Sequence, residues 1–199
     1  MARSRAKDHD EKRGAILRQA AIVFARDGYD RASMARLAAE CGVSKALLYH
    51  YYTSKEALLF DILRSHLAEL VDVVEEADDP ALDPHKRLER LVVALLEAYR
   101  DADDEHQVQL AALSLLPEAA QQELKSLERQ LVVIFSQAIK DVEPSLFEDK
   151  SLLKPVTMSL FGMLNWVYMW FRDGGALSRE GYGKLATRLL VGGLKELAR

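Results

Sequence analysis

The chain has 199 residues, 49% of them apolar and 29% charged, which excludes a disordered chain and allows one larger domain or two small ones. Its net charge is -4, but residues 1–64 hold 12 Lys and Arg against 8 Asp and Glu, whereas residues 65–199 hold 15 against 23. This asymmetry predicts that the first part, and not the rest, meets a polyanion.

Cysteine usage and hydropathy indicate the cellular compartment in which we expect the protein. Cys41 is the only cysteine, which excludes an intrachain disulfide framework and fits a reducing, cytoplasmic environment. No apolar segment follows the basic N-terminus, so we expect no signal peptide. Residues 155–171 form an uncharged run of 17 residues, shorter than the about 20 that a transmembrane helix needs. We therefore expect a buried core or interface helix there and no membrane partner.

Apolar residues recur at helical spacing along most of the chain, for example over residues 17–24, 88–96 and 124–135, and no alternating run indicates a strand. Turn signals at residues 27–28, 42, 53–54, 78–80, 143–144 and 173–175 divide the chain into about nine helices. The prediction is an all-α fold with a first domain over residues 1–54 and a second, helical domain over residues 55–199.

The most informative stretch is residues 33–56, SMARLAAECGVSKALLYHYYTSKE. Ser33 is a good N-cap for a helix that runs to about residue 40, and Ser44 is a good N-cap for the next. Gly42 suits the intervening turn, where a left-handed backbone favours a residue without a Cβ. Thr53 and Glu56 have the spacing of a capping box for a further helix. Two short helices three residues apart, with a glycine between them, predict a helix-turn-helix.

The side chains of this stretch separate into an inner and an outer set. The apolar residues can form a small shared core, and they are Met34, Leu37, Ala38, Val43 and Leu48. Four residues remain outward on the second short helix, where they can donate to phosphates or touch base edges in a major groove, namely Lys45, Ala46, Tyr49 and His50.

The run GVSKALLYHYYTSKEAL, residues 42–58, resembles the signature of the TetR/AcrR family of transcriptional regulators. The strong resemblance covers about residues 10–64, and the remainder is similar mainly in architecture. It implies a helix-turn-helix DNA-binding domain and a helical ligand-binding and dimerisation domain. The expected function is a ligand-responsive repressor, not an enzyme. Such a repressor binds double-stranded DNA at a palindromic operator as a homodimer, paired through its last two helices, and a small effector releases it.

The resemblance also implies roles by position. Lys45 and Ala46 would face bases, and the phosphates would be held by Ser33, Tyr49, Tyr51 and Lys55, with His50 as a further contact. We also count Ser44 and Leu47 with the DNA-contacting residues. Several of them have a structural alternative: Ser33 is also a cap, Tyr49 a packing aromatic, Lys55 a solvated lysine and Leu47 a core residue. Tyr52 is expected to be an aromatic core residue.

Residues 154–175, KPVTMSLFGMLNWVYMWFRDGG, are apolar on more than one helical face, which predicts a helix buried on all sides. Gly162, Gly192 and Gly193 are expected to let helices approach closely. The fragment GMLNWVYMWFRDGGALS, residues 162–178, resembles the corresponding helix of TetR-type regulators that respond to acyl-CoA thioesters in fatty-acid, steroid or aromatic-acid degradation.

Five residues of this segment add polar tips to an apolar body, which is typical of a ligand pocket. They are Asn165, Trp166, Tyr168, Trp170 and Arg172, and the first four are the predicted ligand-binding residues. Tryptophan and tyrosine are also enriched at protein interfaces, so a pocket and a dimer surface both remain open for Trp166 and Trp170.

We expect no metal and no cofactor, only a small effector such as an acyl-CoA, because the five histidines lack metal-ligand spacing. A drug-responsive regulator of an efflux pump is the alternative within DNA binding. An all-α enzyme is disfavoured because no acid/base or metal set converges. A protein-binding adaptor is disfavoured by the basic first part and the capped helix-turn-helix.

Overall fold

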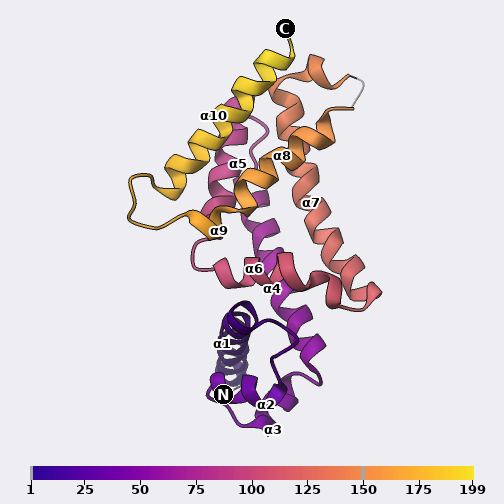
Figure 1. The fold of residues 1–199 in the computed structure, drawn as a ribbon, viewed down its shortest axis with the longest axis vertical. Helices are drawn as coiled ribbons and strands as arrows, with labels where there is room; N and C mark the ends of the chain where they lie inside the picture. The colour runs from indigo at the N-terminus through magenta and orange to yellow at the C-terminus, as the bar shows by residue number, and fades with distance from the viewer. Residues whose placement is uncertain (1, 149–150) are drawn as a thin grey trace. The chain divides into compact units, whose positions relative to one another are not determined.

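A computed structural model describes residues 2–148 and 151–199, with side chains from residue 9 onward. Within these ranges every regular element is a helix, as Figure 1 shows, so the predicted all-α fold is confirmed. Among the described residues, nine helices are longer than a single turn, as expected. The elements are α1 (Ala2–Asp27), α2 (Met34–Glu40), α3 (Lys45–Tyr51), α4 (Lys55–Ala77), α5 (Pro84–Ala98), α6 (Asp103–Ala112), α7 (Glu118–Val142), α8 (Leu153–Asn165), α9 (Val167–Trp170) and α10 (Arg179–Leu197), with short 3-10 helices η1 (Leu113–Leu115) and η2 (Pro144–Phe147).

The chain forms two compact units. Unit 1 comprises Met1–Leu67 and Ala102–Leu124, and unit 2 comprises Ala68–Asp101 and Lys125–Arg199. Helices α4 and α7 each contribute residues to both units. The functional boundary expected after residue 54 stays a prediction.

The core of unit 1 follows from the helical spacing of apolar side chains. On α1, Leu17, Ala21 and Phe24 are at most 8% exposed, and this helix packs against α2 and α6. Leu58 and Leu63 of α4 are fully buried in the same unit. Each fully buried leucine contributes roughly 1.5–3 kcal/mol relative to an exposed one, so this small unit has an apolar core of its own.

A polar network fixes the end of α3 within unit 1. Tyr52 follows α3, is 6% exposed as expected of a core aromatic, and donates its hydroxyl to Asp61 Oδ2 of α4 at 2.7 Å. Arg13 of α1 donates its Nε to the same oxygen at 3.0 Å. Burial, followed by the Asp61 carboxylate, raises the pKa of Tyr52, so the phenol remains a proton donor. The network therefore ties α1 and α4 to the end of α3.

In unit 2, α5 and α10 pack against one another. The apolar stripe of α5 is fully buried and consists of Leu88, Leu91, Val92, Leu95 and Leu96. Gly183 of α10 permits the close approach, because a Cβ there would lie 3.0 Å from Val93 Cγ2. Nothing lies within 4 Å of a Cβ built at Gly162, Gly192 or Gly193, so the close approach expected at these glycines is not made within one chain and stays a prediction for a second copy.

A nearly buried arginine links three segments of unit 2. Arg87 of α5, whose side chain is 8% exposed, donates Nε to Asp78 Oδ1 and Nη1 to Asp141 Oδ2, both at 2.6 Å. These hydrogen bonds join α5 to the loop before it and to α7. Charge-assisted bonds of this length are stronger than neutral ones, so we assign Arg87 a structural role.

Residues 154–175 depart from their prediction. The helix is interrupted at Trp166, where α8 ends and the four-residue α9 begins. Within one chain the segment is not buried on all sides, because Met158, Trp166, Met169 and Trp170 are between 49 and 59% exposed, and burial at an interface stays a prediction. An apolar pattern shows that a face avoids water, but it does not show whether the same chain covers it. None of the described helices is long and apolar enough to cross a membrane.

Candidate functional site

The two short helices α2 and α3 begin as predicted. Ser33 Oγ accepts a hydrogen bond from Arg36 N at 3.3 Å, and Ser44 Oγ accepts one from Leu47 N at 3.1 Å. Gly42, between the helices, has a φ of +66°, a left-handed conformation that residues with a Cβ rarely adopt. Each capping hydroxyl still has its own proton, so a cap can also donate to a phosphate. Both roles proposed for Ser33 therefore remain compatible.

The start of α4 differs from the prediction by one residue. Ser54 is the cap, because its Oγ accepts from Ala57 N at 3.1 Å and its carbonyl accepts from Leu58 N at 3.2 Å. The predicted capping box at Thr53 is therefore wrong. Both residues carry a hydroxyl, and only the backbone bond to Leu58 decides which of them precedes the helix.

Helix α3 has one buried face and one exposed face. Leu48 is fully buried, whereas Lys45, Ala46, Tyr49 and His50 are exposed, which is the outward set expected from sequence. Lys45 Nζ lies 5.8 Å from the centre of the Tyr49 ring, so the cation and the aromatic ring sit side by side on this face. Leu47 is half-buried, and its assignment to core or to DNA stays open.

Tyr51 and His50 belong to a row of aromatic rings that also includes His9, which the sequence did not indicate. Tyr51 is half-buried, and its ring centre lies 4.7 Å from that of His9 on α1 and 5.9 Å from that of His50. Nothing in the local pattern indicates the contact of His9 with a residue 42 positions away, because that contact depends on how α1 and α3 pack.

Lys55 lies at the start of α4 and reaches back to the turn between α1 and α2. Its Nζ donates to Tyr29 O at 2.9 Å and lies 4.1 Å above the centre of the Tyr29 ring. Burial, and then the Glu56 carboxylate, raises the pKa of Tyr29 to about 12, so this ring stays neutral at physiological pH. The predicted phosphate contact of Lys55 stays a prediction, but the lysine also holds the turn that leads into α2.

The acidic groups beside α2 are already paired with arginines. Asp27 Oδ2 accepts from Arg26 at 2.9 Å and forms an ion pair with Arg36 Nη2 at 2.8 Å, and Glu40 accepts from Arg26 at 3.0 Å. Arg26 is the main cause that lowers the pKa of Asp27. In the part of the chain that the structure describes, Lys45 has no ion pair, so its charge is available to a polyanion.

The four predicted effector residues in unit 2 have different surroundings. Asn165 Oδ1 accepts from the hydroxyl of Tyr99 at 3.1 Å, and Trp170 packs its ring on Tyr182, with centres 5.0 Å apart. Trp166 lies beside Tyr168 at 6.1 Å. Trp166 and Trp170 are 56 and 51% exposed, whereas Asn165 and Tyr168 are half-buried. Within one chain the two tryptophans therefore form surface rather than the wall of an enclosed cavity.

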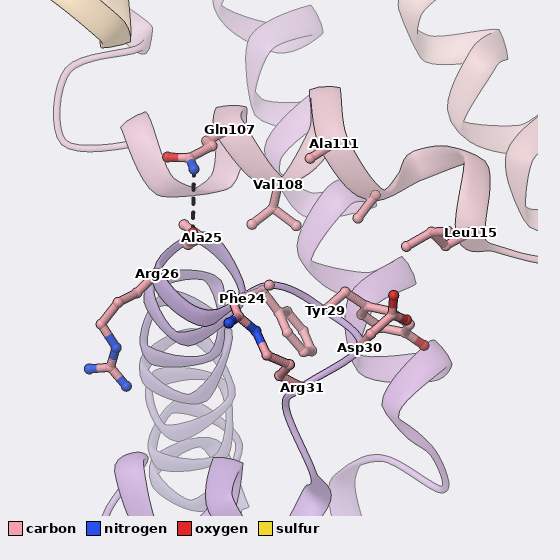
Figure 2. A pocket seen from close by; sticks show the side chains of 12 residues that line it. Phe24, Ala25, Arg26, Tyr29, Asp30, Arg31, Gln107, Val108, Ala111 and Leu115 are labelled. Atoms are coloured by element: carbon pink, nitrogen blue, oxygen red, sulfur yellow. Dashed lines mark hydrogen bonds between the residues drawn. The ribbon is translucent and has the colours of Figure 1, made fainter.

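Cavities occur elsewhere. Unit 1 has a cavity of about 540 Å³ between the end of α1 and the α6–η1 segment, shown in Figure 2. Unit 2 has shallower ones of about 300 Å³, between α5 and α10, and about 350 Å³, between α4 and α7. Sequence reasoning predicted none of these, because each is formed by helices far apart in the chain. The described residues contain no group of His, Cys, Asp or Glu that could hold a metal ion.

Comparison with known families identifies both parts of the chain. Residues 16–62 match the family described as "Bacterial regulatory proteins, tetR family". Residues 81–194 match the family described as "Tetracyclin repressor-like, C-terminal domain", which covers more than half of the sequence. The first match contains α2 and α3, so the helix-turn-helix built above lies in the part that the family description calls regulatory.

Individual proteins agree with these matches. The HTH-type transcriptional repressor KstR2 of Mycolicibacterium smegmatis is 26% identical over 193 residues, covering 93% of this chain and 91% of that protein. A TetR-family transcriptional regulator from Bordetella parapertussis 12822 superposes with a TM-score of 0.85 at 33% identity, covering 89% of this chain and 93% of that one. AibR, solved with isovaleryl coenzyme A and operator DNA, has a TM-score of 0.75 at 25% identity and covers 91% of this chain and 96% of its own.

Proposed function

Because the chain belongs to the TetR family of DNA-binding transcriptional regulators, we propose that it is a repressor that binds a palindromic operator as a homodimer and is released by a small effector. As a member of a family of regulators, it is not an enzyme. The observation that carries DNA binding is the exposed face of α3 opposite the buried Leu48. A short helix with one anchored face and one polar, cationic face suits insertion into a major groove.

The roles on this face follow from chemistry and position. Lys45 and Ala46, in the first turn of α3, would read base edges, and Leu47 would contact a thymine methyl group. Phosphates would be held by the hydroxyl and amine groups around them, with His50 as a further contact. That set comprises Ser33, Ser44, Tyr49, Tyr51 and Lys55.

A binding assay separates base reading from phosphate contact. Fluorescence anisotropy with DNA from upstream of the gene, over a range of salt, should give a log–log slope near -0.9 per phosphate neutralised. We expect Lys45→Ala to change the preference among operator variants, whereas the control Lys86→Ala on α5 leaves it unchanged. Wild-type protein that binds random and upstream DNA equally would contradict the proposal.

The dimer surface is proposed from apolar faces that one chain leaves uncovered. Met158 and Gly162 are four residues apart and share one face of α8. On α10, Leu185 and Leu189 are also four residues apart and are 43 and 60% exposed. Gly162 and Gly192 face open space, so a second copy can approach closely there. A second copy is the occupant because self-association through the last two helices gives two recognition helices about 34–36 Å apart, one turn of DNA.

Light scattering tests this surface. We expect Leu189→Arg to convert a dimer into a monomer, because the interface would bury an unpaired charge. Leu110→Arg is the matched control, because Leu110 on α6 is also exposed, at 46%, but belongs to unit 1. Equal dimerisation of both variants would exclude the α8–α10 surface.

The effector is proposed to be an acyl-CoA thioester from fatty-acid or aromatic-acid catabolism. AibR, which was solved with isovaleryl coenzyme A, supports this class, as does the aromatic character of the segment. The proposed contacts are Asn165, Trp166, Tyr168 and Trp170. A hydrophobic drug, as for a regulator of an efflux pump, is the alternative. No group is needed to supply chemistry, so we propose no cofactor beyond this effector.

An operator-release panel of acyl-CoAs, free acids and hydrophobic drugs distinguishes these classes. The effector must bind the released state about 5.5 kcal/mol more tightly to move a 99:1 equilibrium to 1:99. Trp166 and Trp170 are the only tryptophans, so their fluorescence should report its entry. Release by drugs and not by thioesters would favour the efflux alternative, and release by nothing in the panel would contradict effector control.

A further inference from the structure

The cavity of unit 1 has no role in the function proposed above. Its walls come from the last turn of α1, the turn that leads to α2, and the α6–η1 segment, as Figure 2 shows. Its volume of about 540 Å³ lies within the roughly 300–1,000 Å³ of small-molecule sites. All its lining residues belong to unit 1, which also contains the helix-turn-helix.

The inner wall of the cavity is apolar. Phe24, Val108 and Ala112 line it and are 2 or 3% exposed, so their side chains form a fixed hydrocarbon surface. Leu115 lines the outer part and is 49% exposed. Covering this leucine with an apolar ligand would remove more apolar area from water, at about 25 cal/mol per Å².

The cation suited to a ligand is Arg31. Its Nε donates to the carbonyl of Asp27 at 2.6 Å, and no carboxylate among the described residues forms an ion pair with it, although the Asp27 carboxylate, which is paired with Arg26 and Arg36, is close enough to interact with its charge. Its two terminal nitrogens are thus left for another acceptor, and the planar guanidinium matches a carboxylate in a two-point contact. Arg26 also lines the cavity but is already bonded to Asp27 and Glu40.

One carboxylate, that of Asp30, belongs to the same cavity. Figure 2 shows the Asp30 and Arg31 side chains directed away from one another, with Arg31 on the side of Phe24 and Arg26. The ligand's charged group would therefore meet Arg31 beside the apolar wall rather than Asp30.

We propose that this cavity binds a small carboxylic acid with an apolar tail. The carboxylate pairs with Arg31, and the tail covers Phe24, Val108 and Ala112. Two charge-assisted hydrogen bonds position the head, while apolar burial provides most of the affinity. The site is separate from Asn165, Trp166, Tyr168 and Trp170, which belong to the other unit.

Occupancy of this site would act on the DNA-reading helices through the turn between α1 and α2. Residues 28–31 of that turn line the cavity, and Ser33, two residues later, caps α2. The carbonyl of Tyr29 in the same turn accepts from Lys55 at the start of α4. This regulatory consequence rests on the proposed function, whereas binding of the acid does not.

The test titrates full-length protein with decanoate, followed by calorimetry and by NMR of the Val108, Ala111 and Leu115 methyl groups. We expect saturable binding with shifts at these methyls. Arg31→Gln should weaken it by about tenfold or more, the loss expected for charge-assisted bonds. Ala111→Trp, at an exposed lining position, should abolish it by filling the cavity. The matched control Arg18→Gln, on the exposed side of α1, should bind like wild type.

Ligand analogues test the charge. Decanamide should bind at least about tenfold more weakly than decanoate, because it keeps the tail and loses the charge. Equal binding of the two, tighter binding of decyltrimethylammonium, or unchanged affinity in both Arg31→Gln and Ala111→Trp would overturn the proposal. Failure of the wild type to bind any operator would count against the proposed function alone, since the decanoate titration contains no DNA.

Discussion

Lowering the pH from 7 to 5 is expected to reduce the free energy of unfolding, because one imidazole is buried in the folded protein. His66 of α4 is 4% exposed, and its ring centre lies 5.9 Å from that of His106 on α6, which is 2% exposed. Burial, and then the neighbouring His106, lowers the pKa of His66 from 6.5 to about 3. In the unfolded chain this imidazole is exposed to water, so it binds a proton near its ordinary pKa of 6.5.

The sign and the size follow from linkage. The folded-state pKa is the lower one, so the unfolded state binds the proton more tightly. His66 therefore contributes its full stability above pH 6.5, and this contribution is lost as the pH falls from 6.5 towards 3. Each unit in that window costs about 1.36 kcal/mol, so the free energy of unfolding should fall by about 2 kcal/mol between pH 7 and 5 from this residue.

Urea unfolding followed by circular dichroism, at one protein concentration and at several pH values, measures this loss. Carboxylates and other histidines contribute to the wild-type curve, so the comparison is with His66→Leu, which replaces the imidazole by an apolar side chain of similar size that cannot bind a proton. Between pH 7 and 5 the free energy of unfolding of the variant should fall by about 2 kcal/mol less than that of the wild type. His85→Gln on α5, at a half-buried histidine, should leave the curve unchanged. Parallel curves for wild type and His66→Leu would refute a neutral buried imidazole.

Three further substitutions test the packing, each by urea unfolding at pH 7. Gly183→Leu should lower the free energy of unfolding by about 1–3 kcal/mol, because it overpacks α10 against α5. Gly193→Ala, whose Cβ would lie in open space, should not destabilise one chain. Equal effects of the two substitutions would contradict the close approach at Gly183. Arg87→Met should cost roughly 2–3 kcal/mol, because it leaves two partly buried aspartates without their cation, and a neutral result would show that the ion pairs only balance their desolvation. Tyr52→Phe should cost about 1 kcal/mol by removing one hydrogen bond to Asp61, and a loss above about 3 kcal/mol would mean that the network fails as a whole.

The helix-turn-helix could be predicted because its determinants are local. Ser33 and Ser44 cap helices through backbone groups three residues away, and Gly42 is favoured because its own position in the turn has a positive φ. The outward set on α3 follows from a period of 3.6 residues once Leu48 is assigned to the core. Even here Thr53 and Ser54 could not be distinguished, because adjacent hydroxyl residues have the same capping chemistry.

The features that could not be predicted depend on contacts between distant segments. The exposure of Trp166 and Trp170 depends on what covers an apolar face, and the pattern that predicted burial is the same for a core and for an interface. The close approach at Gly183 depends on the position of Val93 on another helix, 90 residues away. The cavity of unit 1 and the His66–His106 pair likewise arise from α6, whose pairing with α1 leaves no local signal.

Lys55 has a thermodynamic property that its sequence position does not reveal. A free lysine side chain loses up to about 2 kcal/mol of rotamer entropy when it is immobilised against a phosphate. Lys55 is already immobilised, by the carbonyl of Tyr29 and the ring below it, and both of these partners are neutral. Folding has thus already ordered this side chain without an ion pair among the described residues, although the Glu56 carboxylate is close enough to interact with its charge. A phosphate at this position would meet a preorganised cation, and its contact would be favoured entropically over one made by a mobile surface lysine.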